Sequence, residues 1–130
     1  MDLQGTRVMV IDDSNTIRRS AEIFLQQAGC DVILAEDGFD ALAKIADHHP
    51  DVIFVDIMMP RLDGYQTCAL IKKNSRYRET PVIMLSSKDG LFDRARGRLV
   101  GSDEYLTKPF SKDALLSAVN RHHGGAGTDS

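Results

Sequence analysis

The segment Val52-Ile53-Phe54-Val55-Asp56 limits the possible folds of this 130-residue chain more than any other feature. Four consecutive apolar residues, three of them Val or Ile, are typical of a strand that is covered on both faces, as in a parallel sheet. A sheet with one face in water would instead alternate apolar and polar residues. The segment also ends in a carboxylate, at the sheet edge where open α/β folds bind ligands. We therefore expect Asp56 to lie at a functional edge of a parallel sheet.

The rest of the chain alternates strand patterns with helix patterns. Further strands are predicted over residues 7–13, 31–35, 81–87 and 104–107. Helices are predicted over residues 17–28, 39–46, 65–73, 91–100 and 111–123. Ser111 is suited to cap the last helix, and Asp13 or Ser14 the first. Short connections between such units predict an α/β fold with a doubly wound, five-stranded parallel sheet and five helices. We expect one domain over residues 1–123 and a flexible tail over residues 124–130.

Composition excludes several classes of function. The formal net charge is −3 and there is no basic block, so nucleic acid is not an expected partner. The N-terminus has no apolar core of signal-peptide length, and no apolar run is long enough to span a membrane. We therefore expect a cytoplasmic protein without membrane insertion. Cys30 and Cys68 have no motif spacing and are expected to be buried, unpaired side chains.

Polar residues gather where the predicted strands end. Asp12 and Asp13 follow the first strand, Asp56 ends the third, Ser86 lies near the end of the fourth, and Lys108 follows the fifth. In a parallel sheet these side chains meet at one edge, and crowded carboxylates need a cation to stay ionised together. A hard divalent metal such as Mg²⁺ fits this donor set. The combination is suited to phosphoryl transfer with an aspartate nucleophile.

Taken singly, each of these residues also has an ordinary explanation. Asp12 and Asp13 suit a helix N-cap, Lys108 suits an exposed loop, and Ser86 suits a strand end. None of these explanations accounts for their joint placement at four strand ends.

Together with nearby motifs, these residues resemble the receiver domain of two-component response regulators, of the chemotaxis (CheY-like) type, from Arg7 to about His122. The resemblance rests on Asp12-Asp13, Asp56 with Met59-Pro60 and Asp63-Gly64, Ser86-Ser87, Tyr105 and Lys108-Pro109-Phe110. It implies a flavodoxin-like sheet with the strand order 2-1-3-4-5. Threonine is more frequent than serine at position 86 in this family, and alanine at position 87, but Ser86 keeps the needed hydroxyl.

The resemblance also implies roles for individual residues. Asp56 is the implied phosphoacceptor, Lys108 contacts the phosphoryl group, and Ser86 and Tyr105 are the switch residues. The implied Mg²⁺ ligands are Asp12, Asp13, Asp56 and the backbone carbonyl of Met58. The implied phosphodonor is a CheA-type histidine kinase, and no enzymatic turnover is expected beyond slow loss of the protein's own phosphoryl group.

Two segments, residues 57–67 and 86–93, further resemble single-domain regulators of chemosensory systems that control type IV pili and twitching motility. This implies a downstream protein partner in pilus motility. It leaves open whether the protein is a monomer or a weak phosphorylation-dependent dimer.

Three other functions are weighed against the receiver. A Mg²⁺-dependent phosphatase of the haloacid dehalogenase type has a first-strand acid pair separated by one residue, whereas Asp12 and Asp13 are adjacent. A receiver-like module that binds partners without phosphorylation would not need the complete set of acids, hydroxyl and lysine. A dinucleotide-binding domain is disfavoured because no glycine-rich turn follows the first strand.

Overall fold

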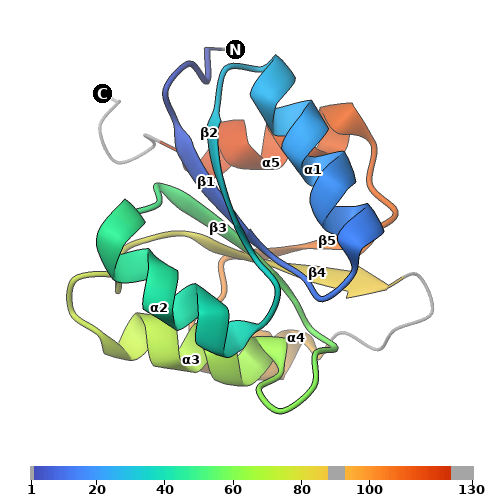
Figure 1. Cartoon of the computed structure of the whole chain (residues 1–130). Helices are drawn as coiled ribbons and strands as arrows, with labels where there is room; N and C mark the ends of the chain where they lie inside the picture. The colour runs from blue at the N-terminus through green and yellow to red at the C-terminus, as the bar shows by residue number, and fades with distance from the viewer. Residues whose placement is uncertain (1, 88–92, 124–130) are drawn as a thin grey trace.

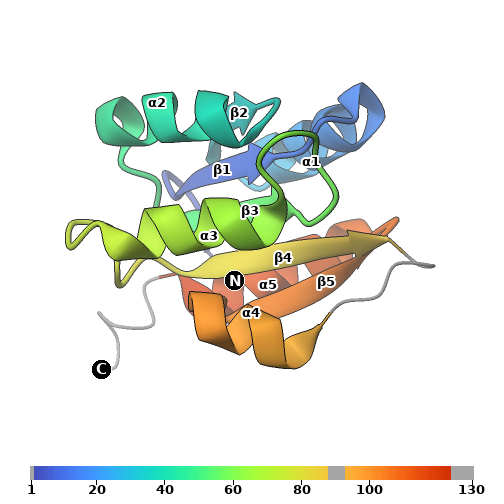
Figure 2. The ribbon, with the colours of Figure 1, turned by 90° about the horizontal axis from the view of Figure 1, so that it is seen from below.

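The computed structural model describes residues 2–87 and 93–123 and contains a five-stranded parallel sheet in the order β2-β1-β3-β4-β5 (Figure 1). The strands are β1 (Arg7–Ile11), β2 (Asp31–Ala35), β3 (Val52–Asp56), β4 (Val82–Ser87) and β5 (Glu104–Lys108). All four neighbouring pairs are parallel. Figure 2 shows the consequence, which is that the strand arrowheads point to one end of the sheet. The predicted flavodoxin-like strand order is confirmed.

Helices cover both faces of the sheet, as a doubly wound fold requires. They are α1 (Asn15–Gln27), α2 (Gly38–His48), α3 (Gly64–Lys73), α4 (Arg94–Val100) and α5 (Lys112–His122). One apolar core joins the sheet to buried residues of α2 and α3, and Val100 of α4 packs against it. A second core joins the opposite face to α1 and α5 (Figure 1).

The central position of β3 follows from its composition. It pairs with β1 on one side and β4 on the other, and all five of its residues are buried. A strand with neighbours on both edges and helices on both faces has no contact with water, which explains its uninterrupted apolar run. Asp56 is therefore a carboxylate at the end of the most protected strand in the sheet.

The helix boundaries follow local capping. The side chains of Ser14 and Ser111 accept hydrogen bonds from the backbone N–H groups of Ile17 and Ala114, which confirms both as N-caps. The helix predicted over residues 91–100 begins instead at Arg94, because Asp93 is its N-cap. A side chain that binds the free N–H groups of a first turn fixes the start of the helix. Residues 91 and 92, and the tail predicted for residues 124–130, lie outside the described residues.

Two simpler expectations were also tested. Cys30 and Cys68 are buried and unpaired, as predicted. In the part of the chain that the structure describes, no helix is long and apolar enough to cross a membrane.

Candidate functional site

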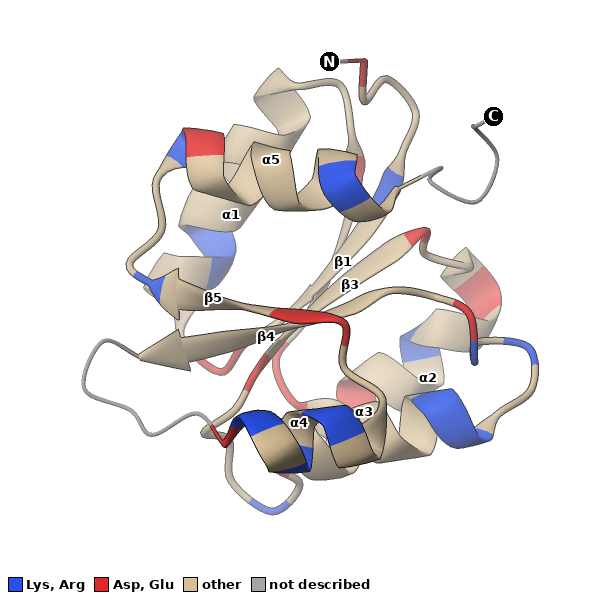
Figure 3. Cartoon of the chain, turned by 180° about the vertical axis from the view of Figure 1, so that it is seen from behind, with Lys and Arg blue, Asp and Glu red and all other residues tan. Residues whose placement is uncertain are grey.

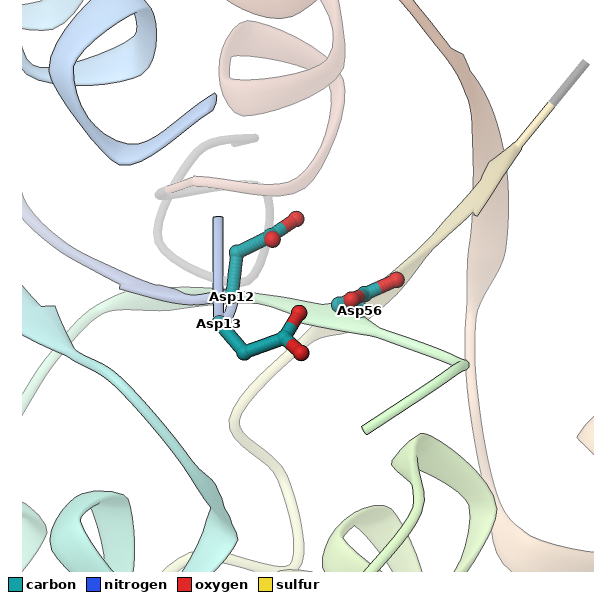
Figure 4. Close-up of side chains that lie close together, drawn as sticks. All are labelled: Asp12, Asp13 and Asp56. Carbon is teal, nitrogen blue, oxygen red and sulfur yellow. The ribbon is translucent and has the colours of Figure 1, made fainter. Parts of the chain in front are cut away.

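Three carboxylates lie together at the carboxyl end of the sheet. Asp12 and Asp13 come from the loop after β1, and Asp56 is the last residue of β3. One oxygen from each lies within 4.8 Å of the others (Figure 4). Asp12 and Asp56 are buried, with exposed fractions of 0% and 3%, whereas Asp13 is exposed. The structure thus brings together the three acids that the sequence predicted.

Local hydrogen bonds hold the first acid in place. Asp12 accepts a hydrogen bond at its side-chain Oδ1 from the backbone N–H of Ser14, at 2.9 Å. Its backbone carbonyl accepts one from the Arg18 guanidinium at 2.5 Å. Ser14 in turn caps α1, so the turn that orients Asp12 also begins the helix. This explains why an acid pair followed by serine is found at this point of the chain.

Lys108 connects two of the three acids. Its Nζ atom donates to Asp12 Oδ2 at 3.1 Å and to Asp56 Oδ1 at 3.0 Å. The lysine side chain is only 15% exposed, so these pairs are largely removed from water. Hydrogen bonds between charged groups are stronger than neutral ones, which makes Lys108 a positive centre of the cluster. The cluster nevertheless contains three carboxylates and one ammonium.

The surroundings shift the pKa values of both partners. Burial raises the pKa of Asp56, and the charge of Asp12 raises it further, while Lys108 opposes the shift; the result is about 6. Burial alone would lower the pKa of Lys108, but its hydrogen bonds and ion pairs with Asp56 and Asp12 raise it above its usual value. At pH 7 Asp56 is therefore mainly ionised and Lys108 is charged.

The donor set matches a hard divalent cation. Mg²⁺ binds oxygen ligands, prefers one or two carboxylates and keeps positions for water and phosphate oxygens. The side chains of Asp12, Asp13 and Asp56 supply oxygens close enough to share one ion. Met58 is at the rim, since its side chain is 73% exposed and its backbone N–H donates to Asp56 Oδ1 at 3.3 Å. The ligand role of the Met58 carbonyl stays a prediction.

Ser86 and Tyr105 lie near the cluster without joining it. Ser86 is 5% exposed, and its hydroxyl donates to the Ser87 carbonyl at 3.3 Å. Its neighbour Leu85 pairs with Asp56 across the sheet. Tyr105 lies three residues before Lys108 on β5, and its hydroxyl accepts a hydrogen bond from Arg94 at 2.7 Å. A switch that uses both residues must therefore act through the backbone and packing between them.

Reasoning from the sequence missed two arginine–tyrosine contacts on α4. Arg94 lies against Tyr105, and Arg96 lies against Tyr65 of α3. The available signal was the alternation of arginine at positions 94, 96 and 98. Residues two apart on a helix point in different directions, so the alternation places arginines on opposite sides of α4.

The sheet order and the acidic cluster with its lysine define the class of protein. A family model described as the response regulator receiver domain matches residues 8–120, and the chain belongs to this family. The family generally acts as a non-enzymatic switch, binds Mg²⁺ at an acidic pocket of this kind, and works with a histidine kinase and downstream effectors.

Individual relatives agree with this assignment. The chain is 75% identical to Protein PilG of Pseudomonas aeruginosa over 118 residues, which cover 91% of this chain and 87% of that protein. It is 42% identical to the probable transcriptional regulator ycf27 of Porphyridium aerugineum over 90% of its length, but spans only 48% of that longer protein.

Solved structures show the same fold. Chemotaxis protein CheY4 of Vibrio cholerae matches with a TM-score of 0.86 and 35% identity, over 91% of this chain and 98% of CheY4. The receiver domain of the Francisella response regulator 1452 matches with a TM-score of 0.83 and 38% identity, over 94% of this chain and 99% of that domain.

Proposed function

We propose that the chain is a single-domain response regulator that accepts a phosphoryl group on Asp56 and then changes its affinity for a protein partner. The observation that carries this proposal is the buried Asp56 carboxylate, which lies 3.0 Å from the Lys108 ammonium and within 4.8 Å of two further acids. A carboxylate with a pKa of about 6 is mainly ionised at neutral pH and can act as a nucleophile.

The proposed reaction is a transfer from phosphohistidine. An oxygen of Asp56 attacks phosphorus, so that an O–P bond forms as the N–P bond of the donor breaks. The leaving imidazole nitrogen keeps the bonding electrons and takes up a proton. Such transfers depend mainly on positioning and on neutralising charge. Lys108 serves both needs, because it already holds Asp56 and can bind a phosphoryl oxygen instead.

The acidic cluster fits the metal that the family binds. We propose that Mg²⁺ is held by the carboxylates of Asp12, Asp13 and Asp56 and by the backbone carbonyl of Met58. When bound, the ion would neutralise the carboxylates and the phosphoryl oxygens together. Asp12 and Asp13 then serve as ligands, and Asp56 as ligand and acceptor. Loss of the phosphoryl group by hydrolysis is proposed to be slow self-dephosphorylation rather than turnover.

We propose that the Ser86 hydroxyl responds to phosphorylation by binding a phosphoryl oxygen. It is buried one strand from Asp56, and among the described residues it donates a hydrogen bond to the Ser87 carbonyl at 3.3 Å. A phosphoryl oxygen offers a stronger acceptor, so the hydroxyl would move toward it. Tyr105, on the strand beside Ser86, would then change its position on the surface formed by α4, β5 and α5.

The proposed partners follow from the relatives. We infer a CheA-type histidine kinase as donor, and a protein of type IV pilus motility as the downstream partner. Support for the second comes from the motif resemblance and from the 75% identity to Protein PilG. A cytoplasmic location belongs to the same proposal, because the ATP used by histidine kinases is found there. We further propose that residues 1–123 form the receiver unit, as a monomer or a weak phosphorylation-dependent dimer.

The direct test is incubation with acetyl phosphate and Mg²⁺, followed by intact mass measurement and peptide mapping. We expect one added phosphoryl group on Asp56, none in Asp56→Asn, and the native amount in Asp63→Asn, which changes a nearby acid outside the cluster. Borohydride reduction before digestion marks the acyl phosphate without relying on its lifetime. Labelling of Asp56→Asn, or continuous release of phosphate from a phosphate monoester, would contradict the proposal.

A further inference from the structure

Helix α4 is held between two tyrosines. Its first residue, Arg94, contacts Tyr105 of β5, and its third residue, Arg96, contacts Tyr65 of α3. Figure 3 shows blue bands of basic residues along α4, which lies beside α3. Both contacts pair a guanidinium with an aromatic ring, but their surroundings differ.

On the α3 side the tyrosine belongs to the core, whereas Arg96 itself is exposed. Tyr65 is 5% exposed, and its hydroxyl accepts a hydrogen bond from the backbone N–H of Asp93, the cap of α4, at 2.8 Å. The Arg96 guanidinium carbon lies 4.3 Å from the centre of the Tyr65 ring, and the same side chain pairs with Asp63 at 3.7 Å. Moving this side of α4 would require breaking several contacts at once.

Tyr65 is also close in sequence to a contact with β3, the strand that carries Asp56. Gly64, which precedes Tyr65, donates a backbone hydrogen bond to the Ile57 carbonyl at 2.9 Å. A Cβ atom at position 64 would lie only 2.4 Å from the Asp56 carbonyl oxygen. Tyr65 is therefore fixed to the end of β3, and we expect this side of α4 to stay in place.

The contact on the β5 side lies at the surface. The Arg94 guanidinium donates to the Tyr105 hydroxyl at 2.7 Å and lies 5.3 Å from the ring centre. Arg94 is exposed and Tyr105 is half-buried. Each interaction is modest at an exposed site, and the guanidinium can return to water when they break. The two sides of α4 thus differ in how easily they can be released.

We propose that Arg94 is a latch that holds Tyr105 in its observed conformation and so opposes the phosphorylated state. The inference rests on the proposed function, since it concerns the regulation of the same site. Tyr105 cannot turn away from Arg94 without giving up both the hydrogen bond and the ring contact. Because these contacts exist in only one of the two states, they bias the equilibrium toward that state.

The coupling between Arg94 and Asp56 predicts the direction in which the affinity for a phosphoryl group changes. If Tyr105 must leave Arg94 when a phosphoryl group binds, then the Arg94 contacts lower the affinity of the site for that group. Removing these contacts raises the affinity by the factor by which they had lowered it. Contacts of this kind at exposed positions correspond to a change of about three- to tenfold. The effect is expected at Asp56 although Arg94 belongs to a different element and is proposed to act only through Tyr105.

The test compares Arg94→Met with Arg98→Met. Both variants remove one arginine charge from α4 and keep an apolar stem, and the first removes the hydrogen bond and the ring contact that Arg94 makes with Tyr105. Beryllofluoride with Mg²⁺ serves as a stable stand-in for the phosphoryl group, and its affinity is measured by NMR titration. We expect binding about three- to tenfold tighter in Arg94→Met, near-native binding in Arg98→Met, and an intermediate value in Arg94→Lys.

A second measurement uses the Arg94→Met variant without metal or beryllofluoride in the sample. In unmodified Arg94→Met, the amide resonances of Ser86 and Lys108 should move part of the way toward their positions in the beryllofluoride complex of the native protein. Equal spectra and equal affinities in Arg94→Met and Arg98→Met would overturn the latch while leaving the proposed function intact. If native protein binds no beryllofluoride, the proposed function itself fails.

Discussion

Lys108 and Asp56 are 52 residues apart in the sequence, and their side chains form a 3.0 Å ion pair. They belong to β5 and β3, with β4 between them. Neighbouring strands are about 4.8 Å apart, so the lysine must span roughly two such spacings. Its long side chain does this at the carboxyl end of the sheet. The pair therefore depends on the order of the strands, and it couples the end of β5 to the proposed acceptor.

The raised pKa of Asp56 predicts how stability depends on pH when no metal is present. The folded pKa of about 6 exceeds the ordinary carboxyl value of 3.8, so protons bind more tightly to the folded state. This group therefore contributes stability that is fully present below about pH 3.8 and is lost as pH rises through about 6. In chelator, Asp56→Asn should be more stable than native protein at pH 7, by about 1–3 kcal/mol, and the advantage should shrink by pH 5.

Urea unfolding at pH 5, 6, 7 and 8 measures this difference. Asp47→Asn, at an exposed position on α2, controls for the loss of one negative charge. If the stability difference between Asp56→Asn and native protein grows toward pH 5, or if the Asn variant is less stable at pH 7, the ionised Asp56 carboxylate does not destabilise the folded state.

Asp13 allows the metal role to be separated from folding. It is exposed, and the described contacts of the cluster place Lys108 against Asp12 and Asp56. Asp13→Ala removes one oxygen ligand, so Mg²⁺ affinity should fall about tenfold or more, by analogy with the loss of other metal-site groups. Removing a charge from a crowded cluster should leave thermal stability unchanged or slightly higher without metal.

Calorimetric titration is suitable because the chain has no tryptophan. Glu79→Ala is the matched control, and equal Mg²⁺ affinity in the two variants would remove Asp13 from the ligand set.

Ser86 and Ser87 provide a matched pair for the switch. They are adjacent on β4, but Ser86 is buried and Ser87 is exposed. Ser86→Ala should still take up a phosphoryl group on Asp56, because the hydroxyl is not part of the acidic cluster. NMR shifts should then remain near Asp56 and fail to reach Tyr105, since the bond that separates the two states is missing. A charge-assisted hydrogen bond of about 1.5–3 kcal/mol is enough to shift such a population tenfold to a hundredfold. Ser87→Ala should behave like native protein. If Ser86→Ala transmits the shifts normally, Tyr105 is reached by another route.

The chain pattern was sufficient to predict the sheet, its helices and the residues at its carboxyl edge. The run from Val52 to Val55 suited a strand covered on both faces better than a one-sided strand, and its burial confirms this. The strand order required the family resemblance, because periodicity does not say which parallel strands are neighbours. The hydrogen bonds of Lys108 and the arginine–tyrosine contacts of α4 were beyond prediction, because they depend on side-chain rotamers that distant elements select. The start of α4 at Arg94 has a local cause that the apolar pattern did not reveal, because the Asp93 side chain caps the helix.

The last prediction concerns the junction between β3 and α3, where Gly64 leaves no room for a side chain. A Cβ atom there would lie 2.4 Å from the Asp56 carbonyl oxygen and 2.7 Å from Ile57 Cα, both of which are backbone atoms. Gly38 is equally crowded, but by the side chains of Thr67, at 2.4 Å, and Leu62, at 2.7 Å. The side chains at Gly38 can rotate at the cost of the hydrogen bond from Thr67 to the Asp63 carbonyl, whereas backbone at the end of a central strand cannot move without displacing Asp56. Gly64→Ala should therefore destabilise the protein by about 2–3 kcal/mol, near the upper end for overpacking, and Gly38→Ala by about 1 kcal/mol. Acetyl phosphate labelling should also slow in folded Gly64→Ala and stay near native in Gly38→Ala. Equal losses of stability in the two variants, measured by urea unfolding, would mean that the β3–α3 loop is freer to move than the close packing against Asp56 implies.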